Sequence, residues 1–108
     1  MREKQIEQKL VRAVKALGGM AVKFVSPGFN GVPDRLVLLP GGKVAFAEVK
    51  APGEIPRPLQ VKRKSQLEAL GFLVYVIDGP EQISEALEEM ANGTWAYRTG
   101  QEGSCFKP

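Results

Sequence analysis

Residues 33 to 50, PDRLVLLPGGKVAFAEVK, constrain the fold of this chain more than any other stretch. The segment has two apolar runs separated by Pro-Gly-Gly, which predicts two strands joined by a tight turn. Asp34 lies seven residues before Gly41 and Glu48 lies seven after it, so a symmetric hairpin places the two carboxylates opposite each other. The Cβ atoms of opposed residues are roughly 4.5 to 5.5 Å apart, and like charges held there repel.

The two strands also predict which side chains surround this pair. Side chains two residues apart on a strand share a face, so Lys50 is expected beside Asp34 and Glu48. The rest of the hairpin is apolar on both faces, with Leu36, Leu38, Val44 and Phe46 on the carboxylate face and Val37, Leu39, Ala45 and Ala47 on the other. Such strands belong in a sheet covered on both sides. Ionised carboxylates at the edge of a core destabilise the fold unless they serve a function. Mg²⁺ prefers carboxylate oxygens and retained waters, so binding this ion is the simplest way to relieve the repulsion between Asp34 and Glu48.

Composition narrows the chemistry further. The chain has 108 residues, the size of one domain, and contains no histidine and a single cysteine, Cys105. Nucleophilic catalysis through histidine, zinc hydrolysis through histidine ligands and a disulfide framework are therefore excluded. No apolar run approaches the roughly 20 residues of a membrane helix, and no secretory segment opens the chain, so a cytoplasmic protein is expected.

Pro33-Asp34, a gap of thirteen residues and then Glu48-x-Lys50 resemble the PD-(D/E)xK nuclease signature. The context is similar to the VRR-NUC group of that superfamily, in small stand-alone form from phages or bacteria. In that group a helix bearing a Glu precedes a Gly, a strand and a Gly-x-Pro-Asp segment, and a helix containing a Gln follows the Glu-x-Lys strand. The corresponding features here are Glu7 in residues 3 to 17, Gly18-Gly19, residues 20 to 25, Gly31 to Asp34, and Gln60 in residues 58 to 70.

This resemblance implies a restriction-endonuclease-like α/β fold and a metal-dependent endonuclease that hydrolyses DNA phosphodiesters. Asp34, Glu48, Glu7 and the Val49 carbonyl would hold Mg²⁺, for which Mn²⁺ would substitute, while Lys50 and Gln60 would complete the catalytic site. Glu7 could instead be a carboxylate on a solvated helix flank, and Glu3 is the second choice. Gln60 could instead satisfy a helix end. Small relatives resemble Holliday-junction resolvases, which implies branched DNA, a homodimer and a bacterial or phage-infected host cell.

The remaining chain predicts the order helix, three strands, helix, strand, helix, a mixed sheet flanked by helices. Helical spacing marks a second helix that Gly71 ends, with Leu59, Arg63, Leu67 and Leu70 at the periodic positions. Residues 72 to 77, FLVYVI, read as a buried strand parallel to the strand before its helix. Pro80 begins a last helix whose core stripe is Ile83, Ala86, Leu87 and Met90, and Asn92-Gly93 ends it. We expect a nuclease domain over residues 1 to 93. The tail, residues 94 to 108, would pack on this domain or on a second subunit.

Charge is distributed unevenly along the chain. The net charge is +3, with basic residues dense between 50 and 64 and acidic residues dense between 78 and 90. A basic side beside the carboxylates suits a polyanion, although solvated helix faces of mixed charge are common. The candidate DNA contacts are Lys23, Asn30, Arg57, Lys62 and Lys64. The alternatives to a nuclease are an inactive nucleic-acid-binding module with the same fold and a structural protein with a charged hairpin edge.

Overall fold

The computed structural model describes residues 2 to 92. Within them the elements are α1 Glu3–Ala16, β1 Met20–Lys23, β2 Arg35–Leu39, β3 Lys43–Val49, α2 Pro58–Ala69, β4 Leu73–Ile77 and α3 Glu81–Ala91. The predicted α/β order is confirmed. The tail from 94 to 108, and with it the boundary at residue 93, lies outside the described residues.

The sheet has the strand order β1-β2-β3-β4, antiparallel from β1 to β3 and parallel between β3 and β4. The parallel pairing confirms the prediction made for a strand that is reached through a helix. In the hairpin, Arg35 pairs with Ala47 and Leu39 with Lys43. Continuing this register by one pair sets Asp34 opposite Glu48, as the symmetric hairpin predicted.

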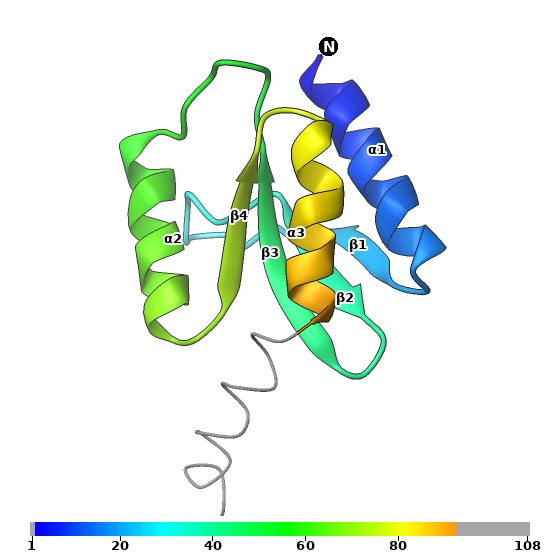
Figure 1. The fold of residues 1–108 in the computed structure, drawn as a ribbon. Coiled ribbons are helices and arrows are strands. Elements are labelled where there is room, and N and C mark those ends of the chain that lie inside the picture. Colours follow the sequence, from blue (N-terminus) through cyan, green and yellow to red (C-terminus); the bar gives the residue numbers. More distant parts are fainter. Residues whose placement is uncertain (1, 93–108) are drawn as a thin grey trace, which may run out of the picture.

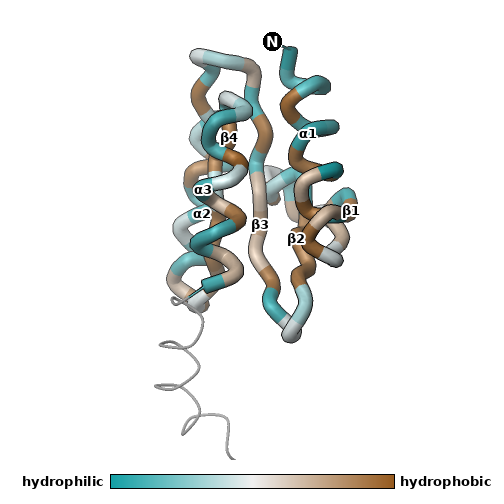
Figure 2. Tube along the Cα trace, turned by 45° about the vertical axis from the view of Figure 1, so that its right-hand side comes forward, coloured by the Kyte–Doolittle hydropathy of each residue, from teal (hydrophilic) through white to brown (hydrophobic). Residues whose placement is uncertain are grey.

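Helices cover both faces of the sheet (Figure 1). The helices α1 and α3 pack on one face, where their buried side chains are Ile6, Leu10, Val14, Ile83, Ala86, Leu87 and Met90. They meet the odd-numbered hairpin residues, including Val37 and Ala45. The even-numbered face lies toward α2. There the Phe46 ring lies 5.5 Å from the rings of Phe24 and Phe72. Figure 2 shows the central strands largely hydrophobic and the helices mixed.

The helix ends follow from glycines at the predicted stops. After α1, Gly18 adopts φ 86° and donates its N–H to the Lys15 carbonyl at 2.9 Å, while Gly19 donates to Val14 at 3.0 Å. After α2, Gly71 adopts φ 101°. A positive φ is costly for other residues, so glycine ends both helices in the same way.

The expectation that the last strand is buried was wrong in part, because only Val74 and Ile77 of β4 are buried. The predicted second helix forms as α2, but it has no buried residue, and Leu59 and Leu70 are 40% and 73% exposed. The physical reason is the same for both elements, because β4 is an edge strand and α2 packs mainly on it. No helix in the described region is long and apolar enough to cross a membrane.

Candidate active site

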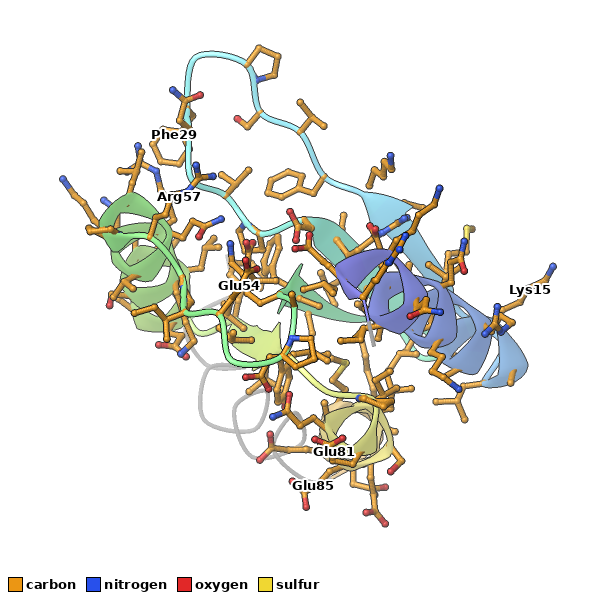
Figure 3. All side chains as sticks on the ribbon, turned by 90° about the horizontal axis from the view of Figure 1, so that it is seen from above. Lys15, Phe29, Glu54, Arg57, Glu81 and Glu85 are labelled. Carbon is orange, nitrogen blue, oxygen red and sulfur yellow. The ribbon has the colours of Figure 1, made fainter. Side chains whose placement is uncertain are left out.

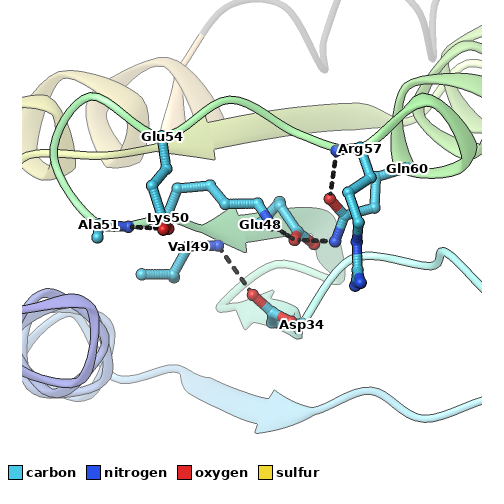
Figure 4. A network of polar contacts seen from close by, with 8 residues as sticks. All are labelled: Asp34, Glu48, Val49, Lys50, Ala51, Glu54, Arg57 and Gln60. Atoms are coloured by element: carbon cyan, nitrogen blue, oxygen red, sulfur yellow. Dashed lines mark hydrogen bonds and ion pairs between the residues drawn. The ribbon is translucent and has the colours of Figure 1, made fainter.

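The carboxylates of Asp34 and Glu48 lie where β2 begins and β3 ends (Figure 4). Asp34 Oδ2 accepts a hydrogen bond of 3.0 Å from the Val49 N–H. Glu48 Oε2 accepts one of 2.6 Å from Gln60 Nε2 and lies 3.3 Å from Lys50 Nζ. The structure therefore brings Asp34, Glu48, Lys50 and Gln60 together, as the sequence predicted.

Glu48 is buried, with 4% of its surface exposed. Its other oxygen, Oε1, has no hydrogen-bond partner, the one such buried side-chain atom in the described residues. Buried polar atoms without partners are rare in folded proteins and call for an explanation. An oxygen held in place but without a donor is what a bound cation requires.

The electrostatics of the site point in the same direction. Burial raises the pKa of Glu48, and the nearby negative charge of Asp34 raises it further, against the lowering effect of Lys50. The ionised form of the Glu48 carboxylate therefore destabilises the folded protein. A cation bound beside it would remove that cost by favouring the charged form.

Gln60 makes one contact at the start of α2 and another with Glu48, the two positions between which the sequence left it open. Its Oε1 accepts a 2.8 Å hydrogen bond from the Arg57 N–H, which satisfies one free donor at the start of α2. Its Nε2 holds the Glu48 carboxylate. Gln60 thereby fixes the Glu48 carboxylate relative to the first turn of α2.

Glu7 forms an ion pair with Arg35, the residue that follows Asp34. Its Oε2 accepts a 2.9 Å hydrogen bond from Arg35 Nε. Arg35 also donates to the Ala21 carbonyl at 2.9 Å and pairs with Ala47, on the sheet face that α1 covers. Arg35 was not among the predicted site residues, although strand alternation places it on this face. The second choice, Glu3, is exposed on α1.

The donor set suits a hard cation with an incomplete protein shell. No group of three His, Cys, Asp or Glu side chains is arranged as a metal site in residues 2 to 92. The site offers two carboxylates, one of them with a buried oxygen that lacks a partner. Mg²⁺ is commonly held by one or two carboxylates together with waters and substrate phosphates. The residues present therefore fit this ion.

The candidate DNA contacts lie on two elements beside the site. Arg57 is exposed directly before α2, Lys62 is exposed on it, and Lys64 is half-buried and pairs with Glu68 at 2.7 Å. Lys23 and Asn30 are exposed on β1 and the following loop. Figure 3 shows Arg57 on one side of the molecule and the acidic residues of α3 on another. Arg57, whose N–H is bonded to the Gln60 that holds Glu48, thus lies away from the acidic α3.

One contact on this side was not anticipated. The Arg63 guanidinium lies over the Phe29 ring, 3.7 Å from its centroid, and its Nε donates to the Asn30 carbonyl at 2.7 Å. The loop also touches α2 at Gly31, where a Cβ would come within 2.7 Å of Leu59. Arg63 is one of the residues whose spacing predicted the second helix, but the sequence gave no indication of its partner.

Another cavity lies away from these residues, between α1 and α3. It has a volume of about 820 Å³, and its charged lining is Lys9, Arg12 and Glu88. This cavity has one carboxylate beside two cations and so lacks a carboxylate pair. The Asp34 and Glu48 edge of the sheet is therefore the candidate active site.

Comparison with known proteins agrees with this geometry. No family model matches the chain. A curated relative, "Putative nuclease p44" of Acyrthosiphon pisum secondary endosymbiont phage 1, is 54% identical over 84 residues, which cover 78% of this chain and 90% of the relative. A solved "VRR_NUC domain" structure superposes with a TM-score of 0.75 at 28% identity, covering 82% of this chain and 97% of that one. The chain belongs to the VRR-NUC nuclease family.

Membership explains why the four residues converge. This VRR-NUC protein has the restriction-endonuclease-like α/β fold, and it acts as a nuclease on nucleic acid. The Pro-Asp and Glu-x-Lys segments that carried the resemblance are the two strand ends where Asp34, Glu48 and Lys50 meet. The solved relative covers most of the described residues, so the similarity extends to the whole fold.

Proposed function

We propose that this VRR-NUC protein is a Mg²⁺-dependent, structure-selective DNA endonuclease, with Mn²⁺ as a substitute ion. The observation that carries this proposal is the buried, unpartnered Glu48 Oε1 beside Asp34 and Lys50. Asp34 and Glu48 would hold the ion, with the Val49 carbonyl and Glu7 as further ligands. To bind the ion, the Glu7 carboxylate would have to leave its ion pair with Arg35 or contact the ion and Arg35 at the same time.

The other residues of the site would have separate functions in binding and catalysis. When bound, the ion supplies Lewis-acid polarisation of the scissile phosphate and lowers the pKa of water at the site. Lys50, with its amine 3.3 Å from Glu48 Oε2, would orient the attacking water and neutralise charge developing on the phosphate. Gln60 would keep Glu48 in position through its 2.6 Å hydrogen bond. Asp34 is oriented by the Val49 N–H.

Lys50→Ala is expected to separate chemistry from metal binding. The substitution removes the positive group from the phosphate, so cleavage should fall about 10²- to 10³-fold. Both carboxylates remain, so Mn²⁺ affinity, measured by calorimetry, should change only a few-fold. Lys62→Ala, on the exposed flank of α2, is the matched control and should retain the cleavage rate at saturating DNA. A tenfold or larger loss of Mn²⁺ affinity in Lys50→Ala would contradict this division.

We further propose that the substrate is branched DNA and that a homodimer presents two sites to a four-way junction. Basic and polar residues flanking the site would contact phosphates, namely Lys23, Asn30, Arg57, Lys62 and Lys64. A chain of 108 residues offers little surface for holding branched DNA alone. Light scattering with and without a junction tests the dimer, and a monomer that cuts the junction would contradict it. The phage relative supports action in the cytoplasm of a bacterial or phage-infected cell.

The deciding experiment compares cleavage of matched four-way-junction, flap and linear duplex DNA in Mg²⁺, Mn²⁺ or EDTA. We expect cutting in either metal, none in EDTA, and a faster rate on branched DNA than on the linear duplex. Equal rates on all three substrates would refute structure selectivity. Binding without cleavage under every condition would instead support the inactive binding module.

A further inference from the structure

A second cavity lies beside the active site, between α2 and the loop that follows β1. Its volume is about 300 Å³, and its walls include Phe24, Phe29, Val32, Arg63, Leu67 and Leu70. An apolar cavity of roughly 150 Å³ is enough to hold a benzene molecule. This cavity could therefore hold a flat heterocycle of one or two rings.

The position of the cavity relates it to the carboxylates. Gln60, which holds Glu48, and Arg63, which lines the cavity, are three residues apart on α2. At 1.5 Å per residue this is about 4.5 Å along the helix axis, and Leu67 lies about 6 Å further on. The cavity therefore begins about one helical turn along α2 from the residue that holds Glu48, so a nucleotide close to a phosphate at the carboxylates could reach it.

The side chains that line the cavity determine which part of a nucleotide can enter it. Aromatic and aliphatic walls cannot solvate a phosphate, but they offer surfaces on which a base can stack. Arg63 presents a planar cation at the wall, held by the Phe29 ring and the Asn30 carbonyl. Two exposed cations, Arg57 at the N-terminal cap of α2 and Lys62 on the helix, can hold the adjoining phosphates.

We propose that this cavity receives one unpaired base of the DNA strand beside the scissile phosphate. A base within a duplex is stacked and paired, and extracting it costs a few kcal/mol, least where it is already unpaired. The cavity therefore selects DNA whose strand leaves the duplex near the cut. This inference rests on the proposed function and specifies the feature of branched DNA that the protein recognises.

Binding measured in a Glu48→Gln background tests the inference without turnover. The probes are a duplex with one unpaired 2-aminopurine and the same duplex fully paired. Phe29→Ala should weaken binding of the unpaired probe about 5- to 100-fold, the range for one lost stacked base, and binding of the paired probe less than twofold. Phe29→Trp should restore binding, and 2-aminopurine fluorescence should be quenched only when position 29 is aromatic.

The controls distinguish stacking from general effects. Val25 is 76% exposed on the same loop and does not line the cavity, so Val25→Ala should bind both probes normally. Lys62→Glu should weaken both probes equally and flatten the salt dependence. Leu70→Ala, at an exposed position of the lining, gives a second variant should Phe29→Ala fail to fold.

Three results would overturn the inference. The first is that Phe29→Ala weakens binding of both probes equally, and the second is that Val25→Ala and Phe29→Ala have equal effects on binding. The third is that 2-aminopurine fluorescence is not quenched when Phe29 is present. A wild-type protein that never cleaves DNA would overturn the proposed function alone, because base capture is measured here by binding.

Discussion

Glu48→Gln is expected to abolish cleavage and, at the same time, to stabilise the metal-free protein at neutral pH. The amide removes the charge required for a cation ligand, so the cleavage rate should fall at least about 10²- to 10³-fold. Its oxygen can still accept the hydrogen bond that Gln60 donates, so the packing of the site is retained. Loss of function and gain of stability would then come from one substitution.

The sign of the stability change follows from the raised pKa of Glu48, which burial causes first and the charge of Asp34 second. A carboxyl group with a raised pKa contributes stability below its unfolded-state pKa, and this contribution is lost as pH rises through the folded-state value. At pH 7 the ionised form therefore costs stability. Glu48→Gln should gain about 1 kcal/mol there, or about 4 to 8 °C in Tm, and the gain should shrink as pH falls toward 4.

Thermal melts of both proteins across this pH range, in EDTA, check the expectation. Glu54→Gln is the matched control, because Glu54 is an exposed carboxylate on the loop beside the site. It should change neither the cleavage rate nor the pH dependence of Tm. A lower Tm for Glu48→Gln at pH 7 would show that the ion pair with Lys50 outweighs the cost of burial.

The hairpin shows why much of this site could be predicted from the sequence. Once Gly41 is taken as the turn centre, the period of two in a strand fixes both the pairing and the face of each residue. That rule alone predicted that Asp34, Glu48 and Lys50 share one face at the end of the hairpin. Helical periodicity placed α1 and α3 equally well, because both bury one continuous stripe against a central sheet.

The contacts that the sequence did not give are those between separate elements. Helical spacing placed Glu7 on a flank of α1, but its partner Arg35 depends on how that helix crosses the sheet. Helical spacing predicted α2 correctly, but among the strands the helix packs mainly on the edge strand β4, so Leu70 remains exposed. Arg63 occupied a position at the same spacing, and only the path of the loop reveals that it stacks on Phe29.

Asp34 should respond oppositely to Glu48 in stability, although its loss should also abolish cleavage. Asp34 Oδ2 is the acceptor for the Val49 N–H, and Val49 is 1% exposed. Asp34→Ala leaves that buried donor without its acceptor, which should cost about 1 to 3 kcal/mol in unfolding free energy. Asp34→Asn retains an oxygen acceptor, so it should remain within about 1 kcal/mol of wild type.

Both Asp34 variants lose the ligand charge, so neither should cleave DNA in Mg²⁺ or Mn²⁺ while both still bind it. Urea unfolding and cleavage, measured on the same preparations, separate the role of Asp34 in stability from its role in cleavage. The free energy of unfolding should differ between Asp34→Asn and Asp34→Ala, whereas both variants should be equally inactive. Wild-type cleavage by Asp34→Asn would remove this carboxylate from the proposed metal site. Equal destabilisation by Ala and Asn would instead show that the charge, rather than the hydrogen bond to Val49, holds the two strand ends together.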